Sequence, residues 1–261
     1  MQKPYRVLGK ARFFELLDGL NRENRSDNKV AMLNEVDMTA CEAVRDAFAR
    51  RGEPRPTYTA FVAKAIADTL RANPEANRIT IEWPFWKRIV QLDDVHLTVA
   101  VERDQPGLEQ GVVAASIYHA DRPNVQEMSV RLHDLATSTE ESNPRWRLLR
   151  RLVDHLPSTL AYWIVSAPRL SPELWIKHRG GSVLISSPAK YGVDVMVAAW
   201  PWPLGFSFGF VRPRPAVIDS QLVMQKTMWV TMSFDRRLMG GAPAARLFKQ
   251  VCDRLQQSKA D

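Results

Sequence analysis

Apolar residues recur at helical spacing in the first half of the chain. Thr39 is followed three residues later by Glu42, a capping box that predicts a helix running to about Arg51. Thr57 can cap a second helix, whose closely spaced apolar residues predict that it is largely buried. Asn73-Pro74 ends this second helix, because the residue before a proline is held away from helical geometry.

The same spacing returns in the second half of the chain. Asn124 with Glu127 forms another capping box, which opens an amphipathic helix. Pro144 and Pro157 bracket a basic segment that we expect to be helical. The apolar residues of Ala242 to Gln257 predict the last helix.

Other segments carry the alternation that is typical of strands. Leu97, Val99 and Val101 form one such pattern, and residues 111–118 form a second beyond a Pro-Gly turn, so the two predict a hairpin. Further strands are expected at Val183 to Ser187 and at Thr227 to Ser233. Helices and strands mix without the regular alternation of a Rossmann or barrel fold. The pattern therefore predicts an α+β protein with helices packed on a mixed β-sheet.

Length and composition add the setting. A chain of 261 residues exceeds the commonest domain size, but no linker, repeat or low-complexity tract divides it, so we expect residues 1–261 to form a single domain. Hydrophobic residues make up 45% and charged residues 25%, which excludes wholesale disorder. Cys41 and Cys252 stand far apart, so no metal site or disulfide framework is expected. Residues 1–20 do not read as a signal peptide, which favours a cytoplasmic protein.

Two features bear on large partners. The longest uncharged run, Val195 to Val211, is interrupted by prolines and glycines, so we interpret it as a buried strand and loop and expect no membrane partner. The net charge is +7, from 36 Lys and Arg against 29 Asp and Glu, which would suit nucleic acid, a membrane surface or a polyanionic cofactor such as coenzyme A. No nucleic-acid-binding motif accompanies the basic residues, so nucleic acid is not an expected partner.

One stretch near the C-terminus carries a specific motif. Ser233 to Ala242 reads S-F-D-R-R-L-M-G-G-A, follows a predicted strand and precedes the last predicted helix. It resembles the D-H-R-x-x-D-G-A motif of the dihydrolipoyl acyltransferases, which form the acyl-transferring cores of 2-oxo acid dehydrogenase complexes. The resemblance implies a chloramphenicol acetyltransferase-like fold that forms trimers.

Further matches follow in the same order along nearly the whole chain. They are V-D-M-T at 36–39, N-P-E-A-N at 73–77, the segment 111–121 and G-G-S-V-L-I-S-S at 180–187. They are similar to the family's V-D-V-T helix start, Y-P-E-L-N helix end, G-L-V-V-P-V-I-R-N-A-D segment and G-G-T-F-T-I-S-N strand. The family's lipoyl-bearing and partner-binding domains have no counterpart here, so no lipoyl attachment site is expected.

The resemblance also assigns candidate catalytic positions. In the family, acyl groups pass between the thiols of coenzyme A and dihydrolipoamide. The motif histidine removes the thiol proton, an aspartate four residues on supports its loop, and a serine of the neighbouring subunit stabilises the oxyanion. Arg236, Gly240 and Ser186 stand at these positions. Arginine stays protonated and offers no acceptor, and losing a general base typically costs about 100- to 10,000-fold in rate.

A histidine elsewhere in the sequence is a candidate replacement for the missing base. His119 has the best position, beside the segment that resembles the family's P-V-I-R stretch. A surface histidine, or one with a structural partner, is the competing interpretation for it. The same holds for the remaining histidines, which are His96, His133, His155 and His178.

Three interpretations of function remain open. The first is a catalytically impaired acyltransferase core that acts as a scaffold or regulatory subunit, in a homotrimer or larger cage and with 2-oxo acid dehydrogenase-type components. The second is an active enzyme that uses coenzyme A or an acyl-coenzyme A and no metal, in which Arg236 favours the thiolate of a bound thiol. The third is a basic nucleic-acid-binding module, which no local feature favours.

Overall fold

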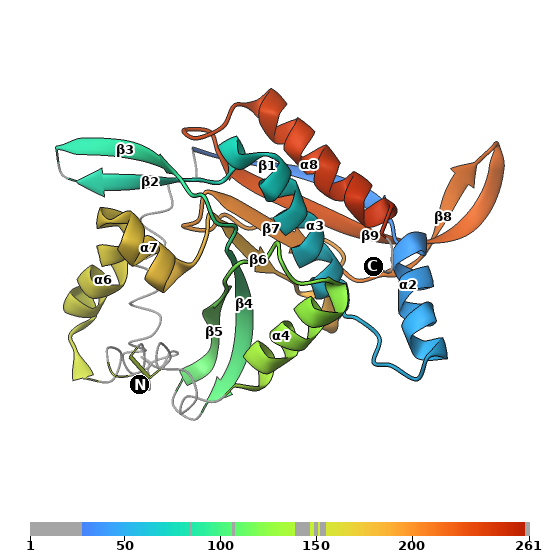
Figure 1. The fold of residues 1–261 in the computed structure, drawn as a ribbon, viewed down its shortest axis with the longest axis horizontal. Helices are drawn as coiled ribbons and strands as arrows, with labels where there is room; N and C mark the ends of the chain where they lie inside the picture. Colours follow the sequence, from blue (N-terminus) through green and yellow to red (C-terminus); the bar gives the residue numbers. More distant parts are fainter. Residues whose placement is uncertain are drawn as a thin grey trace, which may run out of the picture.

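A mixed β-sheet forms the centre of the computed structural model, which describes residues 28–83, 85–105, 108–138, 147–148, 151 and 155–258 (Figure 1). Its seven strands run in the order β1-β9-β7-β6-β4-β5, with β8 paired to β9. β6 is parallel to β4 and β7, and the other neighbours are antiparallel. The strands are β1 (Lys29–Asp37), β4 (Leu97–Gln105), β5 (Leu108–Ile117), β6 (Val183–Ser186), β7 (Leu204–Phe208), β8 (Arg212–Ile218) and β9 (Gln221–Asp235).

Helices α2 (Thr39–Arg50), α3 (Tyr58–Ala72), α4 (Val125–Thr137) and α8 (Gly241–Gln256) pack on one another and on β1, β4 and β9. The apolar stripe of each helix faces the sheet, as helical spacing requires. Burying this surface is the main favourable contribution to folding, at about 25 cal/mol per Å² of apolar area. Fully buried side chains of this core include Met38, Ile66, Leu70, Leu97, Met128, Ile185, Met232 and Leu255.

The segment that precedes β7 packs against the inner strands of the sheet. The Thr231 hydroxyl donates to the Met196 carbonyl at 2.8 Å, and the backbone of Asp194 lies so close to Gly209 that no Cβ would fit there. All five residues of β7 are buried. The interpretation of the uncharged run as a buried strand is therefore confirmed for β7, whereas the loop before it is partly exposed, with Val197 at 54%. No helix in the described part of the chain is long and apolar enough to cross a membrane.

A two-stranded hairpin stands apart from the main sheet. β2 (Arg78–Trp83) pairs with β3 (Trp86–Gln91), and α6 (Ser158–Ser166), η3 (Ala167–Leu170) and α7 (Pro172–Arg179) lie beside it (Figure 1). Ile79, Ile81, Leu92 and Trp175 form a second, smaller core between these elements. The hairpin therefore has its own packing partners.

Asn77 joins this hairpin to the sheet. Its side-chain nitrogen donates to the carbonyls of Leu92 (2.9 Å) and Asp94 (3.0 Å), and its oxygen accepts from the Ser182 hydroxyl at 2.7 Å. The side chain is 1% exposed, so these hydrogen bonds satisfy a polar group that would be costly to bury alone. The last residue of the N-P-E-A-N segment thus has a direct structural role.

Most of the expected elements are present, with one correction. Thr57 caps α3, and the Asn124–Glu127 capping box is complete. The Thr39–Glu42 box is wrong, although α2 does begin at Thr39: an Asp37 oxygen accepts from both the backbone nitrogen and the hydroxyl of Thr39. Glu42 is occupied elsewhere, because it accepts hydrogen bonds from Arg45, Tyr58 and Lys226.

Each expected strand is present, but the structure contains further strands that were not expected. The expected hairpin is β4 with β5, residues 183–187 contain β6, and residues 227–233 are part of the longer β9. Strands β1, β2, β3 and β8 were not expected. The basic segment between Pro144 and Pro157 lies mostly outside the described residues, as do residues 1–27.

Candidate functional site

The motif loop follows β9 and is held by one ion pair. The carboxylate of Asp235, a residue only 4% exposed, accepts hydrogen bonds from the Arg237 backbone nitrogen (2.9 Å) and from its guanidinium (2.6 to 3.1 Å). The same guanidinium donates to Glu82 of β2 at 3.2 Å. We call Asp235, Arg237 and Glu82 the motif cluster. It ties the loop to the β2–β3 hairpin.

The charges around the motif loop shift the pKa values of Asp235 and Lys29. Burial raises the pKa of Asp235, but the hydrogen bonds from Arg237 and the positive charge of Lys29 outweigh it and hold the pKa below its ordinary value. Lys29 pairs with Asp235 across β1 and β9, and its ammonium donates to the Trp202 carbonyl at 2.6 Å. Burial lowers the pKa of Lys29 to about 8, although Asp235 opposes the shift.

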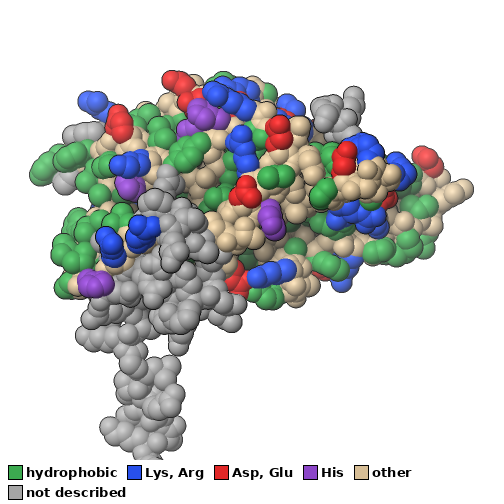
Figure 2. Space-filling model, turned by 60° about the horizontal axis from the view of Figure 1, so that its bottom comes forward, with side chains coloured by type: hydrophobic (Ala, Val, Ile, Leu, Met, Phe, Trp, Pro, Cys, Tyr) green, Lys and Arg blue, Asp and Glu red, His purple; other side chains and the backbone are tan. Residues whose placement is uncertain are grey.

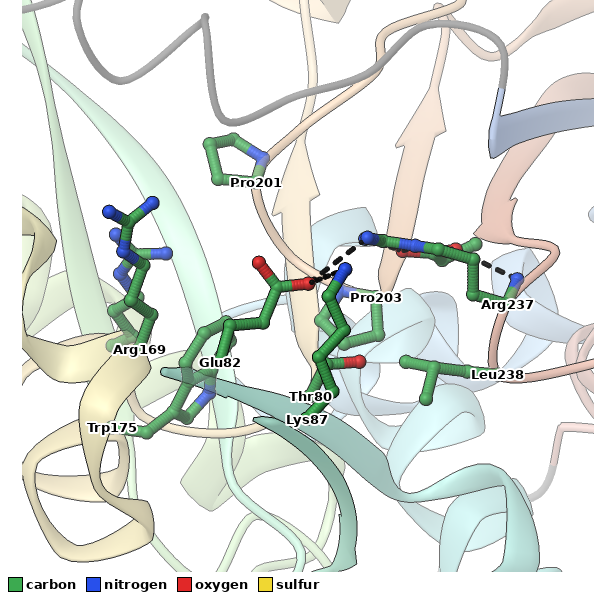
Figure 3. A pocket seen from close by; sticks show the side chains of 11 residues that line it. Thr80, Glu82, Lys87, Arg169, Trp175, Pro201, Pro203, Arg237 and Leu238 are labelled. Atoms are coloured by element: carbon green, nitrogen blue, oxygen red, sulfur yellow. Dashed lines mark hydrogen bonds and ion pairs between the residues drawn. The ribbon is translucent and has the colours of Figure 1, made fainter. Parts of the chain in front are cut away.

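A pocket of about 160 Å³ opens beside the motif cluster (Figure 3). It lies between the β2–β3 hairpin, the η3–α7 segment, the loop before β7 and the motif loop. The lining residues are Thr80, Glu82, Lys87, Arg169, Trp175, Arg179, Pro201, Pro203, Asp235, Arg237 and Leu238. Most of its walls are polar or charged, so it suits a polar ligand better than an apolar one.

Arg236 lies beside this pocket rather than in its lining. Its backbone nitrogen donates to the Asn28 carbonyl at 2.8 Å, while its side chain is exposed and has no hydrogen-bond or ion-pair partner among the described residues. Gly240 is the N-cap of α8 and offers no side chain to cap it. The two arginines of the motif thus differ: Arg237 is structural, and Arg236 faces outward.

Ser186 lies at the other end of the sheet. It is level with Ser207 and, through β7, with Thr231, which is five residues before Arg236 on β9. At about 3.3 Å per residue this offset is roughly 16 Å along the strands. One chain therefore does not bring Ser186 and Arg236 together. The expectation that they meet across a subunit boundary stays a prediction.

His119 follows β5, at the same end of the sheet as the motif loop but four strands away from β9. At about 4.8 Å per strand the separation is on the order of 19 Å. Its Nδ1 lies 3.3 Å from an Asp94 oxygen, its backbone nitrogen donates to His96 Nδ1, and it does not line the pocket. A catalytic role for His119 is a prediction that this pocket does not support.

Several site residues carry no clear sequence signal. Lys29 meets Asp235 only through the β1–β9 pairing, which links residues some 200 positions apart. Glu82 sits in a hairpin that the alternation did not reveal. Arg169 and Arg179 belong to η3 and α7, two short helices whose charged and aromatic residues do not follow a helical spacing, so the sequence did not predict them. The neighbouring motif residue Arg237 was available from the sequence, because the family motif has an arginine at that position.

The two motif arginines provide a matched test of this assignment. Arg237→Gln leaves the buried Asp235 carboxylate without its guanidinium, which is itself 38% exposed, so we expect the free energy of unfolding to fall by about 1 to 2 kcal/mol. Arg236→Gln changes an exposed side chain and should alter it by no more than about 0.5 kcal/mol. Urea unfolding of both variants measures the difference. Equal losses would contradict the separate roles.

Lys29 should make stability depend on pH. Its pKa is about 8 in the folded chain against an ordinary 10.5, so the unfolded chain binds more protons between these values and the free energy of unfolding rises with pH there. We expect this contribution, about 2 to 3 kcal/mol, to disappear in Lys29→Met. Urea unfolding across this range, with the exposed Lys249→Met as control, measures it. If the free energy of unfolding depends on pH in the same way for Lys29→Met and the unmutated chain, this role of Lys29 is wrong.

Comparison with known sequences agrees with the motif. The family model for the 2-oxoacid dehydrogenases acyltransferase (catalytic domain) matches residues 17–145 and 177–260. The dihydrolipoyllysine-residue acetyltransferase component of the pyruvate dehydrogenase complex of Mycobacterium bovis is 23% identical over 240 residues, which cover 88% of this chain and 37% of that protein. The lipoamide acyltransferase component of the branched-chain alpha-keto acid dehydrogenase complex of Pseudomonas putida is 26% identical over 230 residues, which cover 86% of this chain and 46% of that protein. The chain thus spans less than half the length of these relatives.

Solved structures share the fold. The dihydrolipoamide acetyltransferase of Azotobacter vinelandii superposes with a TM-score of 0.70 at 20% identity, covering 97% of this chain and 91% of that one. The cubic core of the pyruvate dehydrogenase multienzyme complex gives 0.68 at 20% identity, with the same coverage. Chloramphenicol acetyltransferase superposes with a TM-score of 0.52 at 12% identity, covering 95% of this chain and 99% of that one. The predicted chloramphenicol acetyltransferase-like α+β fold is confirmed, and the chain belongs to the family of 2-oxoacid dehydrogenase acyltransferase catalytic domains.

Proposed function

We propose that this chain is an acyltransferase core whose own catalytic site is impaired and that it serves as an assembly or regulatory subunit. The observation that carries the proposal is Arg236: an exposed guanidinium occupies the position of the family's base. A thiol with an ordinary pKa near 8.5 is only a few per cent thiolate at neutral pH, so attack without a base is slow. Glu82 and Asp235, the carboxylates that line the pocket, are both bound to cations.

Coenzyme A is the acyl carrier that the family uses, and this chain is suited to hold part of it. The cationic groups of the pocket match an anionic or polar ligand. The pocket has a volume of about 160 Å³ and is open to solvent, so a molecule as long as coenzyme A would extend beyond it. A complete binding site would therefore need surface beyond this pocket, such as that of a second protomer.

Assembly into trimers or a larger cage is part of the proposal. A site that contains both Ser186 and Arg236 requires two protomers, because the two lie at opposite ends of one sheet. The β8–β9 ribbon extends away from the body of the molecule (Figure 1) and carries the exposed apolar side chains Val217, Ile218, Leu222 and Met224. Exposed apolar patches of this kind commonly mark protein contacts. A relative of the same fold is the cubic core of a multienzyme complex.

A nucleic-acid-binding role has less support. On the face shown in Figure 2, the described Lys and Arg side chains are interspersed with Asp and Glu. A nucleic-acid-binding surface would gather its basic groups on one face or along one groove. The described part of that face therefore does not favour the third interpretation.

The fold should tolerate restoration of the family's residues. Gly240 has an extended backbone with φ −74°, and a Cβ added there would meet nothing closer than 3.7 Å. An aspartate at this N-cap would accept a hydrogen bond from the first turn of α8, which stabilises the helix by about a few tenths of a kcal/mol relative to glycine. Arg236 is exposed, so a histidine at this position displaces no core packing.

The first test of the proposal is an acyl-transfer assay with acetyl-coenzyme A and a small dithiol. The unmutated protein should be at least about 100-fold slower than the double variant Arg236→His with Gly240→Asp, which restores a base at the loop. The single variant Gly240→Asp is the control and should stay slow. Ready activity in the unmutated protein that is lost in Arg236→Ala would contradict the proposal and favour the enzyme with altered chemistry.

The second test addresses assembly. Light scattering coupled to size-exclusion chromatography should give a mass of three chains or a multiple of three. Leu222→Lys with Met224→Lys places two charges on the ribbon and should shift the population toward monomer. Arg246→Glu, on the exposed side of α8, is the control and should not. A monomer for the unmutated protein would refute the assembly.

A further inference from the structure

The pocket beside the motif loop has an excess of positive charge. Its lining contains the cations Lys87, Arg169, Arg179 and Arg237 against the carboxylates Glu82 and Asp235. Both carboxylates lie on one side and are already engaged there. Glu82 is 3.1 Å from the Lys87 ammonium and 3.2 Å from the Arg237 guanidinium, and Asp235 binds Arg237. The negative charge of the lining is thus neutralised within the group around Arg237.

Arg169 stands on the other side of the pocket, on η3. Figure 3 shows its guanidinium apart from the group formed by Glu82, Lys87 and Arg237. The residue is half-buried, and its side chain makes no hydrogen bond or ion pair with any residue that the structure describes. A guanidinium has five donors in a rigid fork, which match the two oxygens of a carboxylate or phosphate. Arg169 is therefore a cation in a pocket with no acceptor for it among the described residues.

Arg179 adds a second, more deeply placed positive charge. It is 6% exposed, and its guanidinium carbon lies 4.9 Å from the centre of the Trp175 ring and 5.9 Å from that of Trp202. Aromatic faces stabilise a cation in this position, so the charge is held in a rigid place of low polarity. Attraction for an anion is stronger there than at the open surface, because water screens it less.

From these contacts we infer that the pocket binds a small oxyanion, with Arg169 as its direct, bidentate partner and Arg179 as a supporting charge. The shared chemistry is that of a carboxylate on a short organic acid or of a phosphate group. The pocket, with a volume of about 160 Å³, has room for a short organic acid or a single phosphate. Binding of this kind needs no acyl transfer, so it goes beyond the proposed function.

Isothermal titration calorimetry on the full chain at low salt tests this inference, with succinate and inorganic phosphate as separate probes. At least one probe should bind more tightly than about 10 mM, and the tighter of the two identifies the source of the oxyanion. Arg169→Ala should weaken that binding about tenfold or more, and Arg169→Lys should do so less, since it keeps the charge but loses the fork. Arg246→Ala, an exposed arginine on α8, is the control and should bind as the unmutated protein does.

Two results would overturn the inference: neither probe binds, or Arg169→Ala binds as tightly as the unmutated chain. Thermal unfolding of Arg169→Ala should match the unmutated chain, because this side chain has no partner in the described part of the protein. If that variant unfolds early, Arg169→Gln, which keeps most of the side-chain length, replaces it in the same titration. The titration measures neither transfer nor assembly, so its failure is distinct from failure of the proposed function.

Discussion

The ion pair between Asp235 and Arg237 is the contact on which the site depends. It fixes the chain as it leaves β9, and through Glu82 it holds the β2–β3 hairpin against the motif loop. A carboxylate this deeply buried requires a partner with several donors, and arginine supplies them from the same turn. The pocket, the loop before β7 and the start of α8 all lie around this one pair.

Arg236 and Arg237 are adjacent in the motif but have different roles. Arg237 keeps the loop in place, whereas Arg236 faces outward with a side chain that cannot accept a proton. Gly240, at the start of α8, no longer supplies a side chain to the loop. The family's fold is thus retained, while an arginine and a glycine stand at the positions of the motif histidine and aspartate. A fold can host many functions, and here the site is the part that decides between scaffold and enzyme.

The architecture was predictable where a local rule and tertiary packing agree. Thr57 and Asn124 cap helices whose apolar stripes face the sheet, so spacing and capping predicted both elements. The Thr39 box failed because Asp37, two residues earlier, takes the hydroxyl that the box needs, and Glu42 is drawn to Lys226 on β9. Capping rules use only residues that are close in sequence, so they cannot account for such long-range partners.

The site was predictable only in part, for a similar reason. Arg236 and Gly240 come from one family motif and Ser186 from another segment, and matching segments along the chain cannot say that Ser186 lies at the far end of the sheet. Lys29 and Glu82 reach the motif loop only through strand pairing and the ion pair with Arg237. His119 was suggested by its position near a family segment; it contacts Asp94 and His96 and does not line the pocket, so its catalytic role stays a prediction.

The most direct measurement of the central claim is an experimental structure of the assembled protein in solution, by electron cryo-microscopy. Arg236 of one protomer should lie beside Ser186 of its neighbour at a threefold boundary, with Arg237 bound to Asp235 and no histidine within hydrogen-bonding reach of the site. Arg236 on a free outer surface, or a histidine seated at that boundary, would contradict it.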